Sequence, residues 1–331
     1  MTDHTPSGPT AGEATADVSS PAGRPGAIDA VAVRHPWRWA AVAIIAVLVA
    51  MFINMIVFNP AFNWPFVFQA MNQSPVIEGF IKGTLLVTAL SMVFGVIGGV
   101  VLAVMRLSDN PILSTVSWVY TWFFRAIPRY VLLTIMGALG IVFQDGLALG
   151  VPFDWKIIEW FGLPADTSWR FLTLNANQLF AGLAGAVIGM AASEAAYMAE
   201  IARAGILSVD KGQAEAAQAL GMSPRKAMVR VVLPQAMRVI VPPTGNETIA
   251  MLKDTSLLLA IPLTTELFFQ LKAIGSRTYQ TFPVLISATL YYLIATSILM
   301  IGQSWLERHF GKGFGTSASE RGQQIKMRTD H

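Results

Sequence analysis

The chain of 331 residues contains no cysteine, so disulfide bridges, thiol nucleophiles and thiolate metal ligands are excluded. Histidine is also scarce: the four histidines lie near the two ends of the chain, and no H-E-x-x-H pattern occurs. Neither the G-x-x-x-x-G-K-[ST] phosphate loop nor the G-x-S-x-G nucleophile motif is present. The sequence therefore predicts no metal site, no bound cofactor and no enzymatic activity in this chain.

Charged residues are few as well. They make up 13% of the chain, whereas about a quarter of the residues in soluble domains are charged. Hydrophobic residues make up 54%, and several apolar runs approach the roughly 20 residues that a helix needs to cross a bilayer. The sequence therefore predicts an all-α, polytopic membrane protein. The net charge of +3 suits the positive-inside bias of membrane loops, so nucleic acid is not expected as a partner.

The apolar runs predict about six transmembrane helices. Five of them are expected over residues 39–58, 79–105, 178–201, 236–261 and 283–306. Residues 112–143 are too many for one span, so we divide them into an interfacial helix before Arg125 and a third span after Pro128. The second span carries Gly95, Gly98 and Gly99, which are small enough to let two helix backbones approach closely.

Loop charges predict the orientation of these spans. Lysine and arginine gather before the first span, after the second, in the loop at residues 200–234 and after the sixth span. Residues 59–75, in contrast, contain neither. By the positive-inside rule, both termini and the loop at residues 200–234 are expected in the cytoplasm.

The most specific pattern lies in that polar loop, between the fourth and fifth spans. It consists of Glu215, Ala216, Ala217, Gly221, Val231, Leu233 and Pro234. Gly221 favours a turn after one short helix, and Ser223-Pro224 favours the start of the next. A rigid helix of this kind, seated in the cleft of a soluble partner, can pass rigid-body motion to the spans on both sides. The alternative is an ordinary amphipathic loop helix.

The full pattern resembles the signature of the membrane permease subunits of ABC importers, which is EAA, three residues, Gly, nine residues, Ile, one residue and Leu-Pro. Only Val231 differs, at a position where isoleucine is usual. The flanking segments resemble the polar amino acid permeases of the histidine, glutamine and glutamate type. The segments that carry this resemblance are 123–125 with Pro128, 196–201, 203, 205–206, 212–213, 242–243, 245–247 and 253–257.

The resemblance covers about residues 78–311 and implies a permease subunit that moves an amino acid, or a similar small zwitterion, into the cytoplasm. Together with composition and loop charges it gives four domains: a cytoplasmic tail at 1–36, disordered because it has too little apolar surface to fold, the first span and an external loop at 37–77, the permease domain at 78–311 with a coupling loop at 203–234, and a cytoplasmic tail at 312–331. A multi-pass protein of the cell membrane with both termini in the cytoplasm is expected.

The resemblance also implies partners. A dimer of ABC ATPase subunits, which bind ATP and Mg, would grip the EAA helix between Glu215 and Gly221. A second permease subunit, either identical or a sister chain, and an external solute-binding protein complete the assembly. The residues leave one alternative open, a secondary transporter driven by an ion gradient, although no convincing internal repeat is present.

Ionisable residues in the predicted spans mark the candidate substrate path, because charge in a membrane is costly unless it is paired or hydrated. The candidates are Arg125, Arg129, Ser193, Glu194, Glu247, Lys253 and Asp254. Arg129 and Glu194 depart from the permease pattern, and so does the long outer loop at residues 144–177. We expect Glu194 about two turns from the cytoplasmic end of the fourth span, within reach of Arg129. The two either form a structural ion pair or bind the charged ends of a zwitterion, and the same alternatives apply to Glu247, Lys253 and Asp254.

Overall fold

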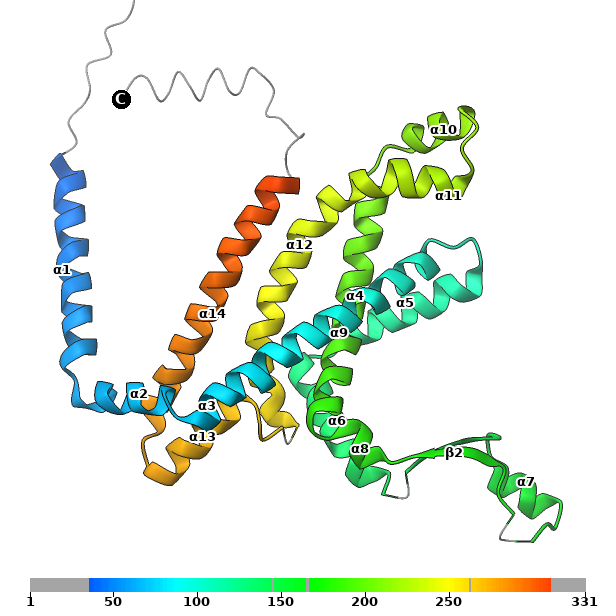
Figure 1. Ribbon diagram of the computed structural model, residues 1–331, viewed down its shortest axis with the longest axis horizontal. Helices are drawn as coiled ribbons and strands as arrows, with labels where there is room; N and C mark the ends of the chain where they lie inside the picture. Colours follow the sequence, from blue (N-terminus) through cyan, green and yellow to red (C-terminus); the bar gives the residue numbers. More distant parts are fainter. Residues whose placement is uncertain (1–35, 145, 165–166, 262, 311–331) are drawn as a thin grey trace, which may run out of the picture. The chain divides into compact units, whose positions relative to one another are not determined.

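The computed structural model describes residues 36–144, 146–164, 167–261 and 263–310 (Figure 1). The tails predicted at 1–36 and 312–331 therefore lie, apart from residue 36, outside the described residues. Helix α1 (Pro36–Phe58) belongs to one compact unit, and the residues from Asn59 onward belong to a second. The apolar side chains of α1 are exposed along the length of the helix, as expected of a helix that faces lipid.

The second unit is built almost wholly from helices. Its first part contains the 3-10 turn η1 (Pro60–Phe62), α2 (Trp64–Met71), α3 (Ser74–Glu78), the π-helical turn η2 (Gly79–Leu85), α4 (Leu86–Arg106), α5 (Pro111–Ala126) and α6 (Arg129–Val142). Strand β1 (Leu147–Gly150), α7 (Asp154–Trp160), β2 (Arg170–Leu174), α8 (Ala176–Phe180) and α9 (Gly182–Leu207) follow. The last part contains α10 (Lys211–Ala219), α11 (Pro224–Ala227), the π-helical turn η3 (Met228–Val232), α12 (Leu233–Asp254), the 3-10 segment η4 (Thr255–Ala260), α13 (Leu267–Thr278) and α14 (Thr281–Phe310). The all-α prediction is confirmed, with one small sheet added.

Four helices among the described residues are long and apolar enough to cross a membrane: Trp37–Phe58, Ser74–Arg106, Gly182–Leu207 and Thr281–Phe310. The pair α5 and α6 makes a fifth if it is counted as one broken span. On length and composition alone, four or five of the roughly six predicted spans therefore qualify. Helix α12 accounts for the difference, because its 22 residues include Arg238, Glu247, Lys253 and Asp254.

The break that was predicted between Arg125 and Pro128 is present. Helices α5 and α6 are bent by 102° where they meet. Ile127 adopts an extended conformation, and Pro128 stands at the N-cap of α6. Proline disfavours a helical conformation in the residue before it, so the chain leaves α5 at this point and starts α6 in a new direction.

Helices α4 and α9 make the most extensive helix–helix contact in the structure. Gly95 of α4 lies directly against Glu194 of α9: a Cβ atom added to Gly95 would come within 2.7 Å of Glu194 Cγ. Gly98 and Gly99 face Ala195 and Met198 in the same way. The prediction that these glycines allow a close helix pair is confirmed.

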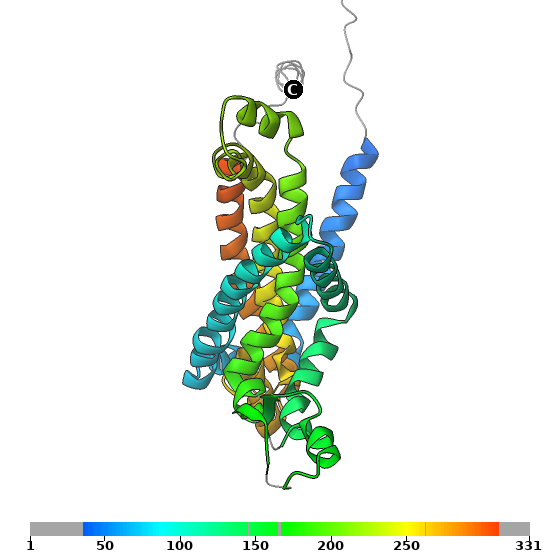
Figure 2. The same cartoon turned by 90° about the vertical axis from the view of Figure 1, so that its right-hand side faces the viewer.

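Figures 1 and 2 show α12 between α9 and α14, and α12 packs against both of them. At the end opposite α10, the helices α2 and α13 pack against α14, and a buried cluster that includes Leu267, Leu271 and Val284 fills the space. The Tyr291 hydroxyl donates to the carbonyl oxygen of Met71 at 2.8 Å, which ties α14 to the end of α2.

The long outer loop contains a structured insertion, defined as residues 146–174. Strands β1 and β2 pair antiparallel, with Leu147 opposite Leu174 and Ala148 opposite Thr173, and α7 lies between them in the chain. We had predicted only a loop here. A pairing of two strands that are separated by the nineteen residues 151–169 is a non-local contact, and periodicity over four or five residues is too short to reveal it.

Candidate functional site

Three helices meet at the guanidinium of Arg129, the first residue of α6. Its Nη1 lies 2.6 Å from Asp254 Oδ2 at the end of α12, and its Nη2 lies 3.1 Å from Glu194 Oε2 on α9. Its Nε also donates to Ser193 Oγ at 3.2 Å. The structure thus brings four of the seven candidate residues into one charged cluster, which we call the Arg129 cluster. The expected contact between Arg129 and Glu194 is confirmed, and Asp254 is a partner that the sequence reasoning did not assign to Arg129.

Glu194 is fully buried, at 0% exposure. It is the thirteenth of the 26 residues of α9, because that helix continues to Leu207. The helix extends six residues past residue 201, where the fourth span was predicted to end, so Glu194 lies thirteen positions, or about three and a half turns, before the helix end. Its second oxygen, Oε1, accepts no hydrogen bond from the described part of the chain. A buried carboxylate oxygen without a hydrogen-bond donor lowers the stability of the fold. Such an oxygen is typical of a functional position.

Tyr197 connects the Arg129 cluster to a neighbouring cavity. The guanidinium carbons of Arg125 and Arg129 each lie 5.6 Å from the centre of its ring, within the range of cation–π attraction. Tyr197 also lines a cavity of about 400 Å³ together with Arg125, Glu200, Val239, Pro243 and Glu247. The candidates Arg125 and Glu247 therefore lie beside the Arg129 cluster, on the walls of a space large enough for a small solute.

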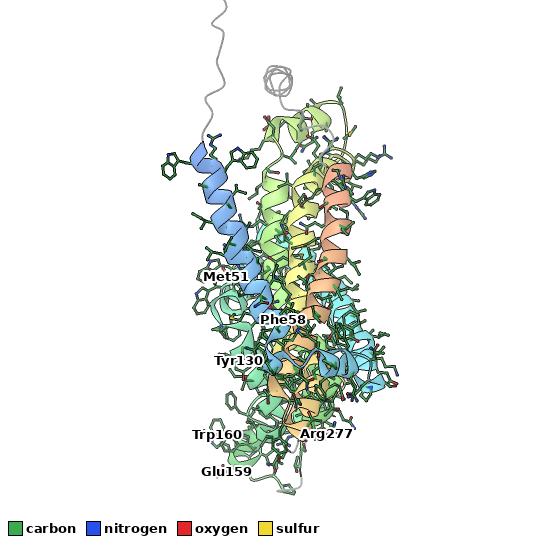
Figure 3. The ribbon with its side chains drawn as sticks, turned by 90° about the vertical axis from the view of Figure 1, so that its left-hand side faces the viewer. Met51, Phe58, Tyr130, Glu159, Trp160 and Arg277 are labelled. Atoms are coloured by element: carbon green, nitrogen blue, oxygen red, sulfur yellow. The ribbon has the colours of Figure 1, made fainter. Side chains whose placement is uncertain are left out.

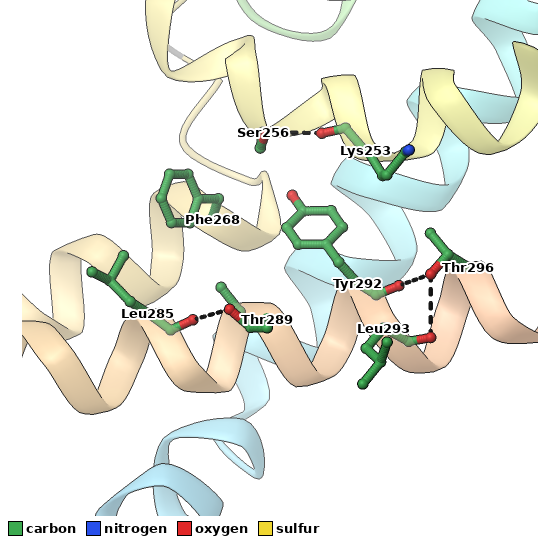
Figure 4. A pocket seen from close by; sticks show the side chains of 9 residues that line it. Lys253, Ser256, Phe268, Leu285, Thr289, Tyr292, Leu293 and Thr296 are labelled. Carbon is green, nitrogen blue, oxygen red and sulfur yellow. Dashed lines mark hydrogen bonds between the residues drawn. The ribbon is translucent and has the colours of Figure 1, made fainter. Parts of the chain in front are cut away.

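Lys253 lies apart from the other candidates. It lines a different cavity of about 500 Å³, with Phe268 of α13 and Tyr292 and Thr296 of α14 (Figure 4). Among the described residues no carboxylate forms an ion pair with Lys253, and Asp254 pairs with Arg129 instead. A structural pair between Lys253 and Asp254 is therefore not formed.

Glu266 is a buried acid that the sequence reasoning missed. It stands at the N-cap of α13, and its Oε2 accepts from the backbone nitrogens of Phe268 and Phe269 at 2.7 and 3.0 Å. Its Oε1 accepts from the hydroxyls of Thr84 and Tyr292, both at 3.0 Å. Burial raises the pKa of the Glu266 carboxyl above its ordinary value, although the four donors oppose this shift. Glu266 thus holds α13 to η2 and α14; the signal in the sequence was an acid just before an apolar helix.

The coupling loop at residues 203–234, which we call the EAA loop, forms the helix–turn–helix that was predicted. Asp210 caps α10 by accepting from the nitrogen of Gly212 at 2.7 Å. At the other end, Gly221 has a positive φ of 82°, and the nitrogen of Met222 donates to the carbonyl oxygen of Ala217 at 3.1 Å. This is the Schellman arrangement, which glycine adopts without steric cost. Pro224 follows as the first residue of α11.

Not all of the EAA residues of α10 are available for the contact with a partner that was expected of them. Glu215 and Ala216 are exposed, and Leu220 next to the helix end is 82% exposed. Ala217, in contrast, is buried within the loop itself, so it supports α10 instead of offering a surface to a partner. Leu233 and Pro234 are exposed at the start of α12, where proline at the first turn is tolerated.

The EAA loop connects the two acidic helices of the Arg129 cluster. Its elements α10, α11 and η3 follow α9, which carries Glu194, and lead directly into α12, which carries Asp254. In Figure 1, α10 and α11 lie at one end of α9 and α12, whereas α13 and the insertion lie at the other. The EAA loop is therefore continuous in the chain with both helices that carry the acidic partners of Arg129.

Comparisons with known proteins agree on one family. Residues 95–312 match the family described as binding-protein-dependent transport system inner membrane component. The chain is 43% identical over 290 residues to the arginine transport system permease protein ArgU of Corynebacterium glutamicum, a match that covers 88% of this chain and 85% of that protein. It is 33% identical over 266 residues to the L-cystine transport system permease protein TcyB of Bacillus subtilis, covering 79% of this chain and 98% of that one.

Among solved structures, the chain is similar to the crystal structure of an amino acid ABC transporter with histidines. The TM-score is 0.53 at 30% sequence identity, over 78% of this chain and 98% of that one.

Proposed function

The chain belongs to the family of binding-protein-dependent transport system inner membrane components, and we propose that it forms the membrane path of an ABC importer that admits an amino acid. The amino acid permeases to which it is similar support this substrate class. One observation carries the proposal: the EAA loop joins α9 directly to α12, and these helices hold Glu194 and Asp254 on either side of Arg129.

In this proposal the energy comes from partners. Two ATPase subunits, which bind ATP and Mg, grip α10 through the exposed Glu215, Ala216 and Leu220. Movement of α10 shifts the cytoplasmic ends of α9 and α12, and this alters the geometry around Arg129. A second permease subunit, identical or a sister chain, closes the path, and an external solute-binding protein delivers the substrate. Both termini and the EAA loop then lie in the cytoplasm, because lysine and arginine are concentrated there.

The charge balance at the site favours a cationic amino acid. Two guanidinium groups, Arg125 and Arg129, and three carboxylates, Glu194, Glu247 and Asp254, lie in the cluster and the cavity wall, which leaves an excess of one negative charge. Glu200, also in that wall, does not change this balance because Arg203 pairs with it at 2.7 Å. Arg125 offers a partner for the carboxylate of an amino acid, and Glu247 offers a partner for an ammonium or guanidinium group in the same cavity. The similarity to an arginine permease points in the same direction.

The test is uptake into vesicles that contain the chain, its ATPase subunits and its binding protein. We expect uptake of labelled arginine to require ATP and to be inhibited less by cystine or glutamine than by lysine. Uptake that follows an ion gradient without ATP would support a secondary transporter instead. Glu215→Lys should abolish uptake and release the ATPase subunits, because the exposed charge of α10 is reversed.

A pair of variants tests the proposed selectivity. Glu247→Gln should reduce the preference for arginine over glutamine, because it removes the carboxylate in excess. Glu78→Gln is the matched control, since Glu78 is an exposed acid of α3 that pairs with Lys82 four residues on and lines neither the cluster nor its cavity. If Glu247→Gln and the unaltered chain prefer arginine over glutamine to the same extent, Glu247 does not distinguish substrates by their charge.

A further inference from the structure

The insertion exposes an unusual amount of aromatic surface. Trp160 is 87% exposed and Phe171 is 78% exposed, and Phe153, Trp155 and Phe161 are exposed as well. These side chains come from α7, from its flanking residues and from β2, so they share one small structural unit. Large aromatic side chains that are exposed together on one small unit are rare on a water-facing loop and mark a contact with lipid or with another protein.

The charges of the insertion are mostly satisfied within it. Arg170 Nε lies 3.5 Å from Asp154 Oδ2, and Lys156 Nζ lies 5.1 Å from the centre of the Trp155 ring. Among the described residues of the insertion, Glu159 is then the acid left without an ion pair. Protein partners are usually steered by complementary charge, and these residues offer little of it. A lipid interface, in contrast, accepts aromatic side chains together with a few self-paired charges.

The insertion continues the apolar surface of a span. It starts four residues after α6 ends at Val142, and α8 and α9 follow directly after β2. Tyr130, Ile141 and Val142 of α6 are exposed, and Figure 3 shows Tyr130 and Trp160 on the same side of the molecule. The aromatic surface therefore begins where the apolar helix surface reaches the end of the membrane-spanning part.

We propose that the insertion is an interfacial anchor that seats Trp160, Phe161 and Phe171 in the lipid headgroup region of the leaflet opposite α10. Aromatic rings prefer this region, where they combine an apolar body with contact to a polar boundary. The anchor holds the outer ends of α6 and α9, which are the helices that carry Arg129 and Glu194. Those helices then pivot about a fixed outer end when α10 moves.

The absence of cysteine allows a direct test. Trp160→Cys and Phe171→Cys are each labelled with a nitroxide in the full chain, assembled with its ATPase subunits in lipid nanodiscs. Collision with oxygen, which partitions into lipid, is compared with collision with a water-soluble nickel complex. Glu159→Cys is the matched control, because Glu159 is the exposed charged neighbour of Trp160. Phe171→Cys gives the same reading from β2 if the change in α7 disturbs folding.

We expect nickel accessibility at residues 160 and 171 to be several-fold lower than at residue 159, with oxygen accessibility higher. Nickel accessibility equal to that at residue 159 would overturn the proposal. Labels that are open to nickel in the nanodisc and become protected only when the solute-binding protein is added would also overturn it, because the surface would then be a protein docking site. Neither result would affect the proposed transport function, which is measured separately by ATP-dependent uptake.

Discussion

The guanidinium of Arg129 lies 3.1 Å from Glu194 Oε2, which links the first residue of α6 to the middle of α9. The same guanidinium lies 2.6 Å from Asp254 Oδ2, so the pair expected from the sequence is in fact a triad. This changes what each substitution does. Loss of the Glu194 charge leaves Arg129 with one carboxylate partner, Asp254. Loss of Arg129, in contrast, leaves both carboxylates without the arginine that pairs with them.

We predict that Arg129→Leu destabilises the protein more than Glu194→Gln does. Removing one member of a buried ion pair costs about 3–5 kcal/mol of unfolding free energy because the remaining charge is stranded. Arg129→Leu should approach that range, and Glu194→Gln should cost less since Arg129 keeps Asp254. The measurement is thermal unfolding of the purified protein in detergent.

Combined variants test whether the three residues act together. The double variant Arg129→Leu with Glu194→Gln should recover only part of the lost stability, because Asp254 remains unpaired. Adding Asp254→Asn should recover more. Effects that simply add across all combinations would show that the triad is not coupled. If the stable triple variant also shows an altered preference between charged and neutral amino acids, the triad lines the substrate path as well.

A second prediction concerns the contact between α4 and α9. Gly95→Ala places a methyl group within 2.7 Å of Glu194 Cγ, so the two helices must separate or Glu194 must shift. Overpacking of this kind costs about 1–3 kcal/mol. We expect a lower unfolding temperature and a weaker apparent affinity for substrate. Gly302→Ala in α14 is the control, because no atom lies within 4 Å of its added Cβ; similar losses in both variants would exclude packing as the cause.

The local features of this chain could be predicted because they depend on nearby residues. The break before α6 follows from Pro128, and the turn after α10 follows from Gly221, which adopts a positive φ. The contact between Arg129 and Glu194 was predictable because opposite charges inside membrane spans usually pair with each other, since an unpaired charge there is energetically unfavourable. The glycines of α4 likewise indicated a close helix pair because of their small size.

Other features depend on contacts that the sequence does not display. Helix α9 continues to Leu207, beyond the apolar run from which the fourth span was predicted, because the polar segment that follows is also helical. Asp254 could not be assigned to Arg129, since the two lie 125 residues apart and their meeting depends on how α12 packs against α9. The role of Glu266 depends on donors from η2 and α14, which only the folded chain brings together.

The turn at Gly221 provides a third prediction. Its φ of 82° is unfavourable for residues with a Cβ, and no atom lies within 4 Å of an added Cβ, so the cost is backbone strain without a clash. A left-handed conformation costs a β-branched residue on the order of 1–2 kcal/mol. Gly221→Val should therefore leave the protein inserted in the membrane but reduce co-purification of the ATPase subunits. Gly221→Asn is the control, because asparagine tolerates this conformation; equal loss in both variants would point to a side-chain effect.

The last prediction concerns pH and Glu266, which lies outside the spanning helices. Burial raises the pKa of its carboxyl above the ordinary value of 4.5, so the folded protein binds this proton more tightly than the unfolded chain does. Stability from this group is therefore fully present below pH 4.5 and is lost as pH rises through the folded-state pKa. Glu266→Gln cannot titrate, and we expect its unfolding temperature to fall less than that of the unaltered chain between pH 4.5 and pH 8. Glu266→Ala removes the cap of α13 and should cost about 1 kcal/mol below pH 4.5, as N-cap losses do, and less as pH rises, because the unaltered chain then loses its own stabilisation from Glu266. The opposite result is an unfolding temperature that rises with pH in the unaltered chain and stays flat in Glu266→Gln. It would mean that the folded state lowers the pKa of Glu266, because the hydrogen bonds donated by Thr84, Tyr292, Phe268 and Phe269 outweigh the effect of burial.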